Sequence, residues 1–168
     1  MSIIKYLLSA LLLVSFAGQP EMLSANNPKH IEGVLSADNS GTFVPDSGGF
    51  TIGQLTVTDP LLIGIPNNQS AFALRIPISF TKKLHKAPAV VTTYFVDTAS
   101  LIGQQLTGTA TATVETVEVS VSGVTNFGFI LNVGFFSFFD PGFTNATIPS
   151  LVSQLADRGF GINFVSQD

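Results

Sequence analysis

The stretch from Arg75 to Asp97, RIPISFTKKLHKAPAVVTTYFVD, decides the fold. It continues a run in which large apolar residues alternate with small or polar ones; the apolar set is Phe72, Leu74, Ile76, Ile78 and Phe80. Because side chains of a β-strand point alternately to its two faces, this period of two predicts a strand with one apolar face. A basic turn over 81–88 follows, and then a β-branched run over 90–96. The stretch therefore predicts a hairpin-like pair of strands that carries one face of a sandwich core.

The segment 106–122 predicts a strand whose phase slips. Its small apolar residues fall first on even and then on odd positions: Ala110, Ala112 and Val114, then Val117, Val119 and Val121. A strand cannot exchange its faces without a bulge or a break, so we place one at Glu115–Thr116. Both faces carry Thr, Ala and Val with few charges, which also predicts a contact surface for another subunit.

The rest of the chain adds short strands and one helix. A turn at Gly123 leads into a second strong core strand, whose apolar face is Phe127, Phe129, Leu131, Val133 and Phe135. Weaker patterns mark strands at 31–35 and at 160–165. A further strand lies within the interval 50–65, where Ile52, Leu55 and Val57 indicate it and the Asp59–Pro60 step ends it. Between the last two core strands, Thr147 begins and Gly159 ends a short helix with Pro149 in its first turn. We therefore predict an all-β fold, an antiparallel β-sandwich of about six or seven strands with one short helical insert.

Composition limits the class of protein. The chain has 168 residues, a net charge of −4 and only 11 % charged residues, whereas soluble domains average about 25 %. This net charge argues against nucleic acid, whose phosphates need a basic face, so we expect no nucleic-acid partner. Lys5 followed by the apolar segment 6–17 predicts a secretory signal over 1–25, with cleavage after Ala17 or after Ala25. One domain over 26–168 remains, and we expect it to be secreted and to have no membrane span.

The order of these pieces resembles the H-type lectin family, the snail agglutinin and discoidin C-terminal type. Three stretches carry the resemblance. They are Ile78-Ser79-Phe80 followed by Ala87-Pro88-Ala89-Val90-Val91, then Val121-Ser122-Gly123-Val124-Thr125-Asn126-Phe127-Gly128-Phe129, and finally Gly161-Ile162-Asn163-Phe164-Val165. Glu32-Gly33-Val34 before the loop at 37–41 is also similar to the family's first strand and loop.

This resemblance implies a secreted, trimeric protein that binds galactose- or N-acetylgalactosamine-type glycans near its subunit boundaries. It places the sugar contacts on Asp38 and Asn39 in the first loop and on Phe136 and Ser137 at the end of the second core strand. The family's Arg has no counterpart between Leu106 and Thr113. An alternative is a structural or adhesive subunit that self-associates in the same way without binding sugar. Asp38 and Asn39 are also ordinary turn residues.

No other chemistry is indicated. The two histidines, His30 and His85, lie in polar stretches, and no cluster has metal-ligand spacing, so we expect no metal and no cofactor. Glu115 and Glu118 are three residues apart on a strand and point to opposite faces unless the bulge intervenes. We therefore expect no enzyme. The triplets at Asn68 and Asn145 are glycosylation sequons that matter only in a eukaryotic source.

Overall fold

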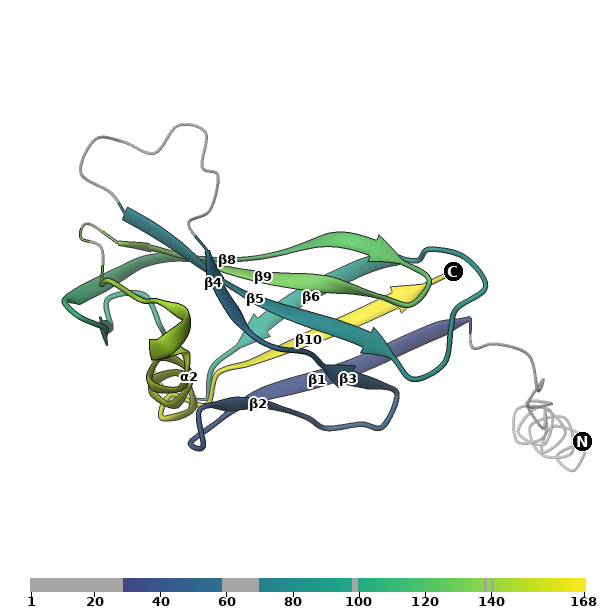
Figure 1. The fold of residues 1–168 in the computed structure, drawn as a ribbon, viewed down its shortest axis with the longest axis horizontal. Helices are drawn as coiled ribbons and strands as arrows, with labels where there is room; N and C mark the ends of the chain where they lie inside the picture. Colours follow the sequence, from purple (N-terminus) through teal and green to yellow (C-terminus); the bar gives the residue numbers. More distant parts are fainter. Residues whose placement is uncertain (1–28, 59–69, 98–99, 138, 140) are drawn as a thin grey trace, which may run out of the picture.

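The computed structural model describes residues 29–58, 70–97, 100–137, 139 and 141–168. Within them the chain forms ten strands, one 3-10 turn and one α-helix, arranged as two antiparallel sheets (Figure 1). The all-β sandwich with one helical insert is confirmed. The predicted signal over 1–25, the Asp59–Pro60 step and the sequon at Asn68 lie outside the described residues. No helix in the described part is long and apolar enough to cross a membrane.

One sheet has four strands in the order β2-β1-β10-β6, and all neighbours are antiparallel. Its strands are β1 (His30–Asp38), β2 (Thr42–Pro45), β6 (Ala89–Phe95) and β10 (Gly161–Gln167). Burial alternates along β1 and β10, so one face of this sheet lies on the core and the other is open to solvent.

The other sheet has six strands in the order β3-β5-β9-β8-β7, with β4 also paired to β5. Its strands are β3 (Phe50–Ile52), β4 (Thr56–Thr58), β5 (Ser70–Phe80), β7 (Gln105–Thr107), β8 (Thr111–Thr125) and β9 (Gly128–Ser137). Ten strands are therefore found where six or seven were predicted. The difference comes from edge strands of three or four residues, which are too short to show a period in the sequence.

The core between the sheets is rich in phenylalanine. Phe129 lies between Phe80, at a centroid distance of 5.8 Å, and Phe164, at 5.1 Å, with both rings edge to face. Phe50, from the opposite sheet, packs against Phe164 with the two ring centroids 4.9 Å apart. The Phe50 ring also packs onto Gly33, where a Cβ atom would stand 2.2 Å from a ring carbon. Glycine at this position of β1 therefore makes the close approach of the two sheets possible.

The predicted hairpin over 75–97 is wrong. Its two strands, β5 and β6, belong to different sheets, and the chain over 81–88 crosses from one sheet to the other. Each strand has its own core face, and the eight-residue connection is longer than the two to five residues usual for a hairpin. Local alternation predicted both strands but carries no information about which sheet each one joins.

The predicted phase slip is confirmed, and the predicted contact surface on this strand stays a prediction. The pairing of β8 with β9 shifts register between Val114 and Thr116, as expected for a bulge there. After the bulge, Val117 is buried, and Val119 and Val121 pack against the core. Thr, Glu and Ser residues occupy the opposite face of β8, so this solvent face is polar along most of the strand.

The turn between β8 and β9 also lies later than predicted. The strand β8 passes through Gly123 and ends at Thr125, and the chain turns at Asn126 and Phe127. Phe127, predicted to be in the core, is therefore 60 % exposed. Gly128 opens β9 with φ of 153°, and a Cβ atom there would stand 1.9 Å from the carbonyl oxygen of Ile78.

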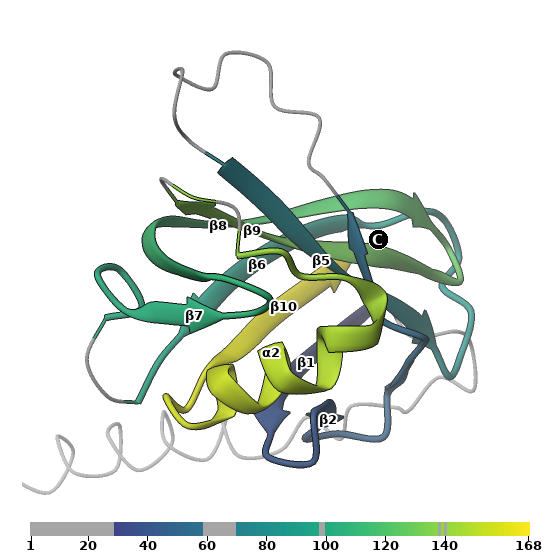
Figure 2. The same cartoon turned by 60° about the vertical axis from the view of Figure 1, so that its left-hand side comes forward.

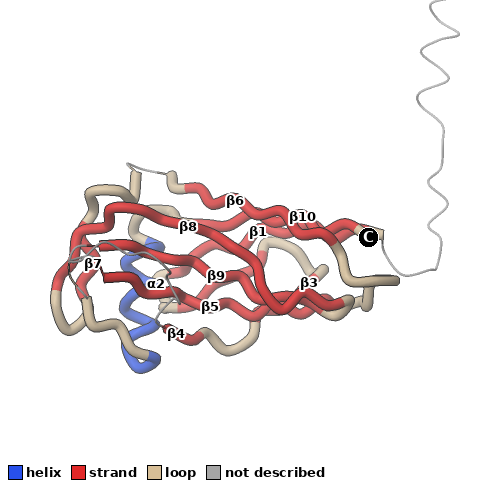
Figure 3. The backbone as a smooth tube through the Cα atoms, turned by 90° about the horizontal axis from the view of Figure 1, so that it is seen from above, coloured by secondary structure: helices blue, strands red, loops and turns tan. Residues whose placement is uncertain are grey.

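The helix α2 (Ile148–Ala156) follows a 3-10 turn, η1 (Asn145–Thr147), and covers one end of the sandwich (Figure 2). In Figure 3 it runs across the strands at that end. The helix buries its apolar side at the spacing of α-helical turns, with Ile148, Leu151, Val152 and Leu155. Its predicted bounds are confirmed: Thr147 is the N-cap residue, and Gly159 follows the helix with φ of 63°. The Thr147 hydroxyl bonds back to Thr144 and closes η1.

Candidate functional site

A hollow lined by described residues lies beside the open edge of β1. The strand β2 leaves this sheet at Pro45, after which the Asp46 N–H donates to the Val34 carbonyl at 2.9 Å. The chain then crosses over 47–49 to β3 in the other sheet. The first residues of β1 are therefore paired with β10 on one side only.

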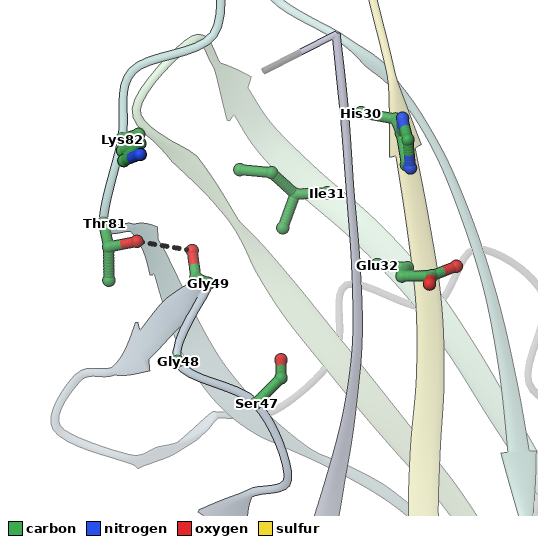
Figure 4. A pocket seen from close by; sticks show the side chains of 8 residues that line it. All are labelled: His30, Ile31, Glu32, Ser47, Gly48, Gly49, Thr81 and Lys82. Atoms are coloured by element: carbon green, nitrogen blue, oxygen red, sulfur yellow. Dashed lines mark hydrogen bonds between the residues drawn. The ribbon is translucent and has the colours of Figure 1, made fainter. Parts of the chain in front are cut away.

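This hollow, which we call the cleft, measures about 450 Å³. It is lined by β1, by the crossing segment and by the residues that follow β5: His30, Ile31, Glu32, Ser47, Gly48, Gly49, Thr81 and Lys82 (Figure 4). In Figure 4 the side chain of Ile31 points from β1 toward Gly49 and Thr81, whereas His30 and Glu32 lie on the β10 side of the strand. The cleft therefore has an apolar floor with polar groups around it.

Two hydrogen bonds hold the far wall of the cleft. The Thr81 N–H and the Thr81 hydroxyl both donate to the Gly49 carbonyl, at 3.1 Å and 3.0 Å. The side chains of Glu32, Ser47 and Lys82 are exposed and make no hydrogen bond or ion pair with any described residue. A carboxylate, a hydroxyl and an ammonium group are therefore available to a ligand, and the two hydrogen bonds between Thr81 and Gly49 hold the backbone that lines the cleft in place.

The cleft continues across the solvent face of the four-stranded sheet. A second hollow of about 320 Å³ shares Glu32 and Ser47 with it and is also lined by Asp46 and Asn163. A third, of about 130 Å³, shares Asn163 with the second and reaches Val91 and Thr93 on β6. Together they make a groove, bordered by acidic, amide and hydroxyl groups, that crosses the sheet from the cleft to β6.

Asp38 and Asn39, predicted as sugar contacts, lie at the turn between β1 and β2, near the other end of β1. The Asp38 carboxylate accepts a hydrogen bond from the Ser40 hydroxyl and a longer one, 3.4 Å, from the Ser40 N–H. The Ser40 hydroxyl bond, with help from the backbone, lowers the pKa of Asp38 below its ordinary value. This arrangement is the Asx-type turn that such residues commonly make.

Phe136 and Ser137, the other two predicted contacts, lie at the end of β9 in the opposite sheet. Phe136 is half-buried on the solvent face, opposite Ala71 on one side and Thr116 on the other. Ser137 points into the core, is 1 % exposed and donates its hydroxyl to the Phe139 carbonyl. No hydrogen bond joins Phe136 or Ser137 to Asp38 or Asn39 among the described residues, so the four do not form one cluster.

The described residues include no group of three or more His, Cys, Asp or Glu side chains placed to hold a metal ion. Sequence reasoning missed the cleft because its three walls come from positions near 30, 47 and 81, which only the tertiary fold brings together. The available signal was the pair Gly48–Gly49, a break between two strands at which the chain changes sheet.

Comparison with known proteins finds no matching family model, no matching curated protein and no matching solved structure. The resemblance to the H-type lectins therefore stays a prediction.

Proposed function

We propose that the protein is a secreted, non-enzymatic glycan-binding protein, and that the sugar lies in the cleft and the adjoining groove. The observation that carries the proposal is the combination in one hollow of an apolar floor, Ile31, with the free polar groups of Glu32, Ser47 and Lys82. The resemblance to H-type lectins supports the same class of ligand from the sequence.

The chemistry of the cleft suits a sugar ring. A hexose presents hydroxyls around its edge and a patch of C–H groups on its face, so it needs fixed donors and acceptors around an apolar surface. Glu32 accepts from hydroxyls, Lys82 donates to them, and Ser47 does either. The volume of about 450 Å³ lies within the range of small-ligand sites, about 300–1,000 Å³. The second hollow, about 320 Å³, gives an adjoining sugar a place beside Asn163.

A glycan array probed with the purified chain tests this proposal. We expect retention on a restricted set of glycans, with terminal galactose or N-acetylgalactosamine as the class that the family resemblance favours. The variant Glu32→Gln keeps the size of the side chain and removes the charge-assisted hydrogen bonds, which contribute about 1.5–3 kcal/mol each. It should lose binding about tenfold or more, with an unchanged melting temperature. No binding to any glycan above background would contradict the proposal.

A second candidate function is self-association as an adhesive or structural subunit, and we propose a homotrimer as its form. The observation that favours it is an apolar strip on the solvent face of the four-stranded sheet. Val91 is 68 % exposed and Val165 is 46 % exposed, and the two face each other across the β6–β10 pair. An exposed apolar strip on a sheet is a typical contact surface between protein subunits.

Light scattering at micromolar concentration tests this candidate. We expect a mass above that of one chain, and the variant Val91→Lys should reduce it to the monomer, because an unpaired ammonium is costly to bury. The control is Ile102→Lys, at a residue that is 52 % exposed away from the strip. A monomer in the wild type, or the same dissociation in both variants, would contradict the assignment.

A further inference from the structure

The end of the sandwich opposite α2 carries the connection from β5 to β6 and the turn from β8 to β9 (Figure 1). Lysines and one exposed aromatic ring lie on these two segments and beside them. This basic end comprises Lys29, Lys82, Lys83, His85, Lys86 and Phe127. The described part of the chain has six Lys and Arg residues, and four of them lie here. Three acidic residues, Asp38, Asp97 and Asp157, lie at the helix end instead.

The connection that carries most of these cations is pinned to the fold. Leu84 is fully buried, and its N–H donates to the Asn126 carbonyl at 2.9 Å. The Lys86 N–H donates to the Asp168 carboxylate at 3.2 Å, and the Asp168 N–H donates to the Lys29 carbonyl at 2.9 Å. The side chains on either side of Leu84 therefore project outward from a backbone that is already held in place before any ligand binds, which lowers the entropic cost of binding.

Phe127 stands at the tip of the β8–β9 turn among these lysines. Its carbonyl accepts from the Phe80 N–H at 2.8 Å, which fixes the backbone, while its ring remains 60 % exposed. The Lys83 ammonium lies 4.9 Å from the ring centroid, in the geometry of a cation–π contact. Val124, 36 % exposed, adds apolar surface on the same turn.

We propose that the basic end docks on an anionic phospholipid surface, with Phe127 entering the interface and Lys83 and Lys86 contacting headgroup phosphates. The proposal goes beyond glycan binding, since none of these three residues lines the cleft. Charge complementarity supports it, because each lysine brought close to an anionic leaflet strengthens binding about fivefold. The Phe127 ring beside Lys83 adds the apolar contact that peripheral binding also requires.

The net charge of −4 does not oppose this docking. The ten residues of β9 separate the two ends by about 30 Å, at about 3.3 Å per residue of strand. Charges beyond about 8–10 Å are screened at physiological ionic strength. A membrane that meets the basic end therefore experiences its four lysines together with Asp168 and Glu32, which lines the cleft with Lys82, rather than the acidic residues at the helix end.

The exposed ring favours a bilayer over a sulfated polysaccharide. A polyanion of that kind would use the lysines but offers no apolar phase for Phe127, whereas a membrane interface offers both. The role of the ring therefore separates the two kinds of partner.

The first experiment uses the absence of tryptophan from the chain. The variant Phe127→Trp places a single indole at the tip, and Phe139→Trp places one at the far end of β9, where Phe139 is 72 % exposed. We expect a blue shift of the Phe127→Trp emission on addition of phosphatidylserine-rich vesicles and none with pure phosphatidylcholine. The Phe139→Trp emission should not move with either.

The second experiment is vesicle sedimentation of the full chain. The wild type should bind phosphatidylserine-rich vesicles, and the double variant Lys83→Gln with Lys86→Gln should bind about 25-fold more weakly, from about fivefold per lysine. Phe127→Ser should also weaken binding by about fivefold or more, whereas the matched control Phe139→Ser should not. The apolar segment 6–17 is common to all of these proteins, so differences between variants do not arise from it.

Three results would overturn the proposal. They are absence of binding that depends on phosphatidylserine, equal loss in Phe127→Ser and Phe139→Ser, and unchanged binding in Phe127→Ser. The last result would point to a soluble polyanion as the partner. All of the altered side chains are exposed, so thermal unfolding should confirm that each variant folds as the wild type does.

Discussion

The two ends of the sandwich are closed in different ways. At the helix end, α2 seals the core with side chains, and Leu151, Val152 and Leu155 are each fully buried. At the basic end, backbone hydrogen bonds and the buried side chains of Leu84 and Pro88 hold the connection in place, while lysines and Phe127 face the solvent. The difference indicates that the helix is a cap that stabilises the fold, whereas the opposite end leaves its lysines and Phe127 exposed, the groups that we propose to be used for recognition.

The largest effect should come from the core beneath the basic end. Phe129 is 3 % exposed and lies between two other phenylalanine rings, so Phe129→Ala should reduce the free energy of unfolding by about 3–5 kcal/mol. The neighbouring change Phe127→Ala should cost less than about 0.5 kcal/mol, because that ring is exposed. Chemical denaturation measures both. A loss below about 1 kcal/mol for Phe129→Ala would contradict the assigned core face.

The helix cap should give the next effect. Leu151→Ala removes a fully buried side chain from the contact of α2 with the sheets, and should cost about 2–5 kcal/mol. Ser150→Ala, at the exposed preceding position, should stay within about 0.5 kcal/mol of the wild type. If both variants have the same denaturation midpoint as the wild type, then α2 does not stabilise the fold, and the contrast drawn between the two ends of the sandwich is wrong.

The smallest effect should come from acid titration at the helix end. Since the pKa of Asp38 is lowered by its bond to Ser40, its ionised form stabilises the folded state. That contribution is present above the ordinary carboxyl pKa, about 3.9, and is lost as pH falls through the lower pKa of the folded protein. The melting temperature of Asp38→Asn should therefore fall less than that of the wild type between pH 4 and pH 2, roughly the window that these pKa values set. Parallel curves for the two proteins would show that the Ser40 bond has no effect on stability.

The sequence predicted features that depend on local periodicity. The alternation from Phe72 to Phe80, the slip at Glu115–Thr116 and the helix that ends before Gly159 are each encoded within a few neighbouring residues, and the structure confirms them. The alternation from Phe127 to Phe135 predicted a core position for Phe127, but β9 begins only at Gly128 and Phe127 is exposed, because the period alone does not show where a strand begins.

Features that depend on distant contacts were not predicted. The sheet that β6 joins is decided by its pairing with β10, about 70 residues later in the chain, and nothing within 90–96 encodes that partner. The cleft has the same origin, since its walls near 30, 47 and 81 meet only after both sheets have formed. Asp38, Asn39, Phe136 and Ser137 were chosen by their order along the chain, and the fold places them in two different sheets.

The most direct test of where recognition occurs compares two double variants on a glycan that the wild type retains. One variant, Glu32→Gln with Ser47→Ala, changes the cleft, and the other, Asp38→Ala with Asn39→Ala, changes the turn at the helix end. Our account predicts that the cleft variant loses affinity by about tenfold or more, because it loses a charge-assisted hydrogen bond, while the turn variant binds as the wild type does. Loss of binding in the turn variant, with wild-type affinity in the cleft variant, would contradict the account.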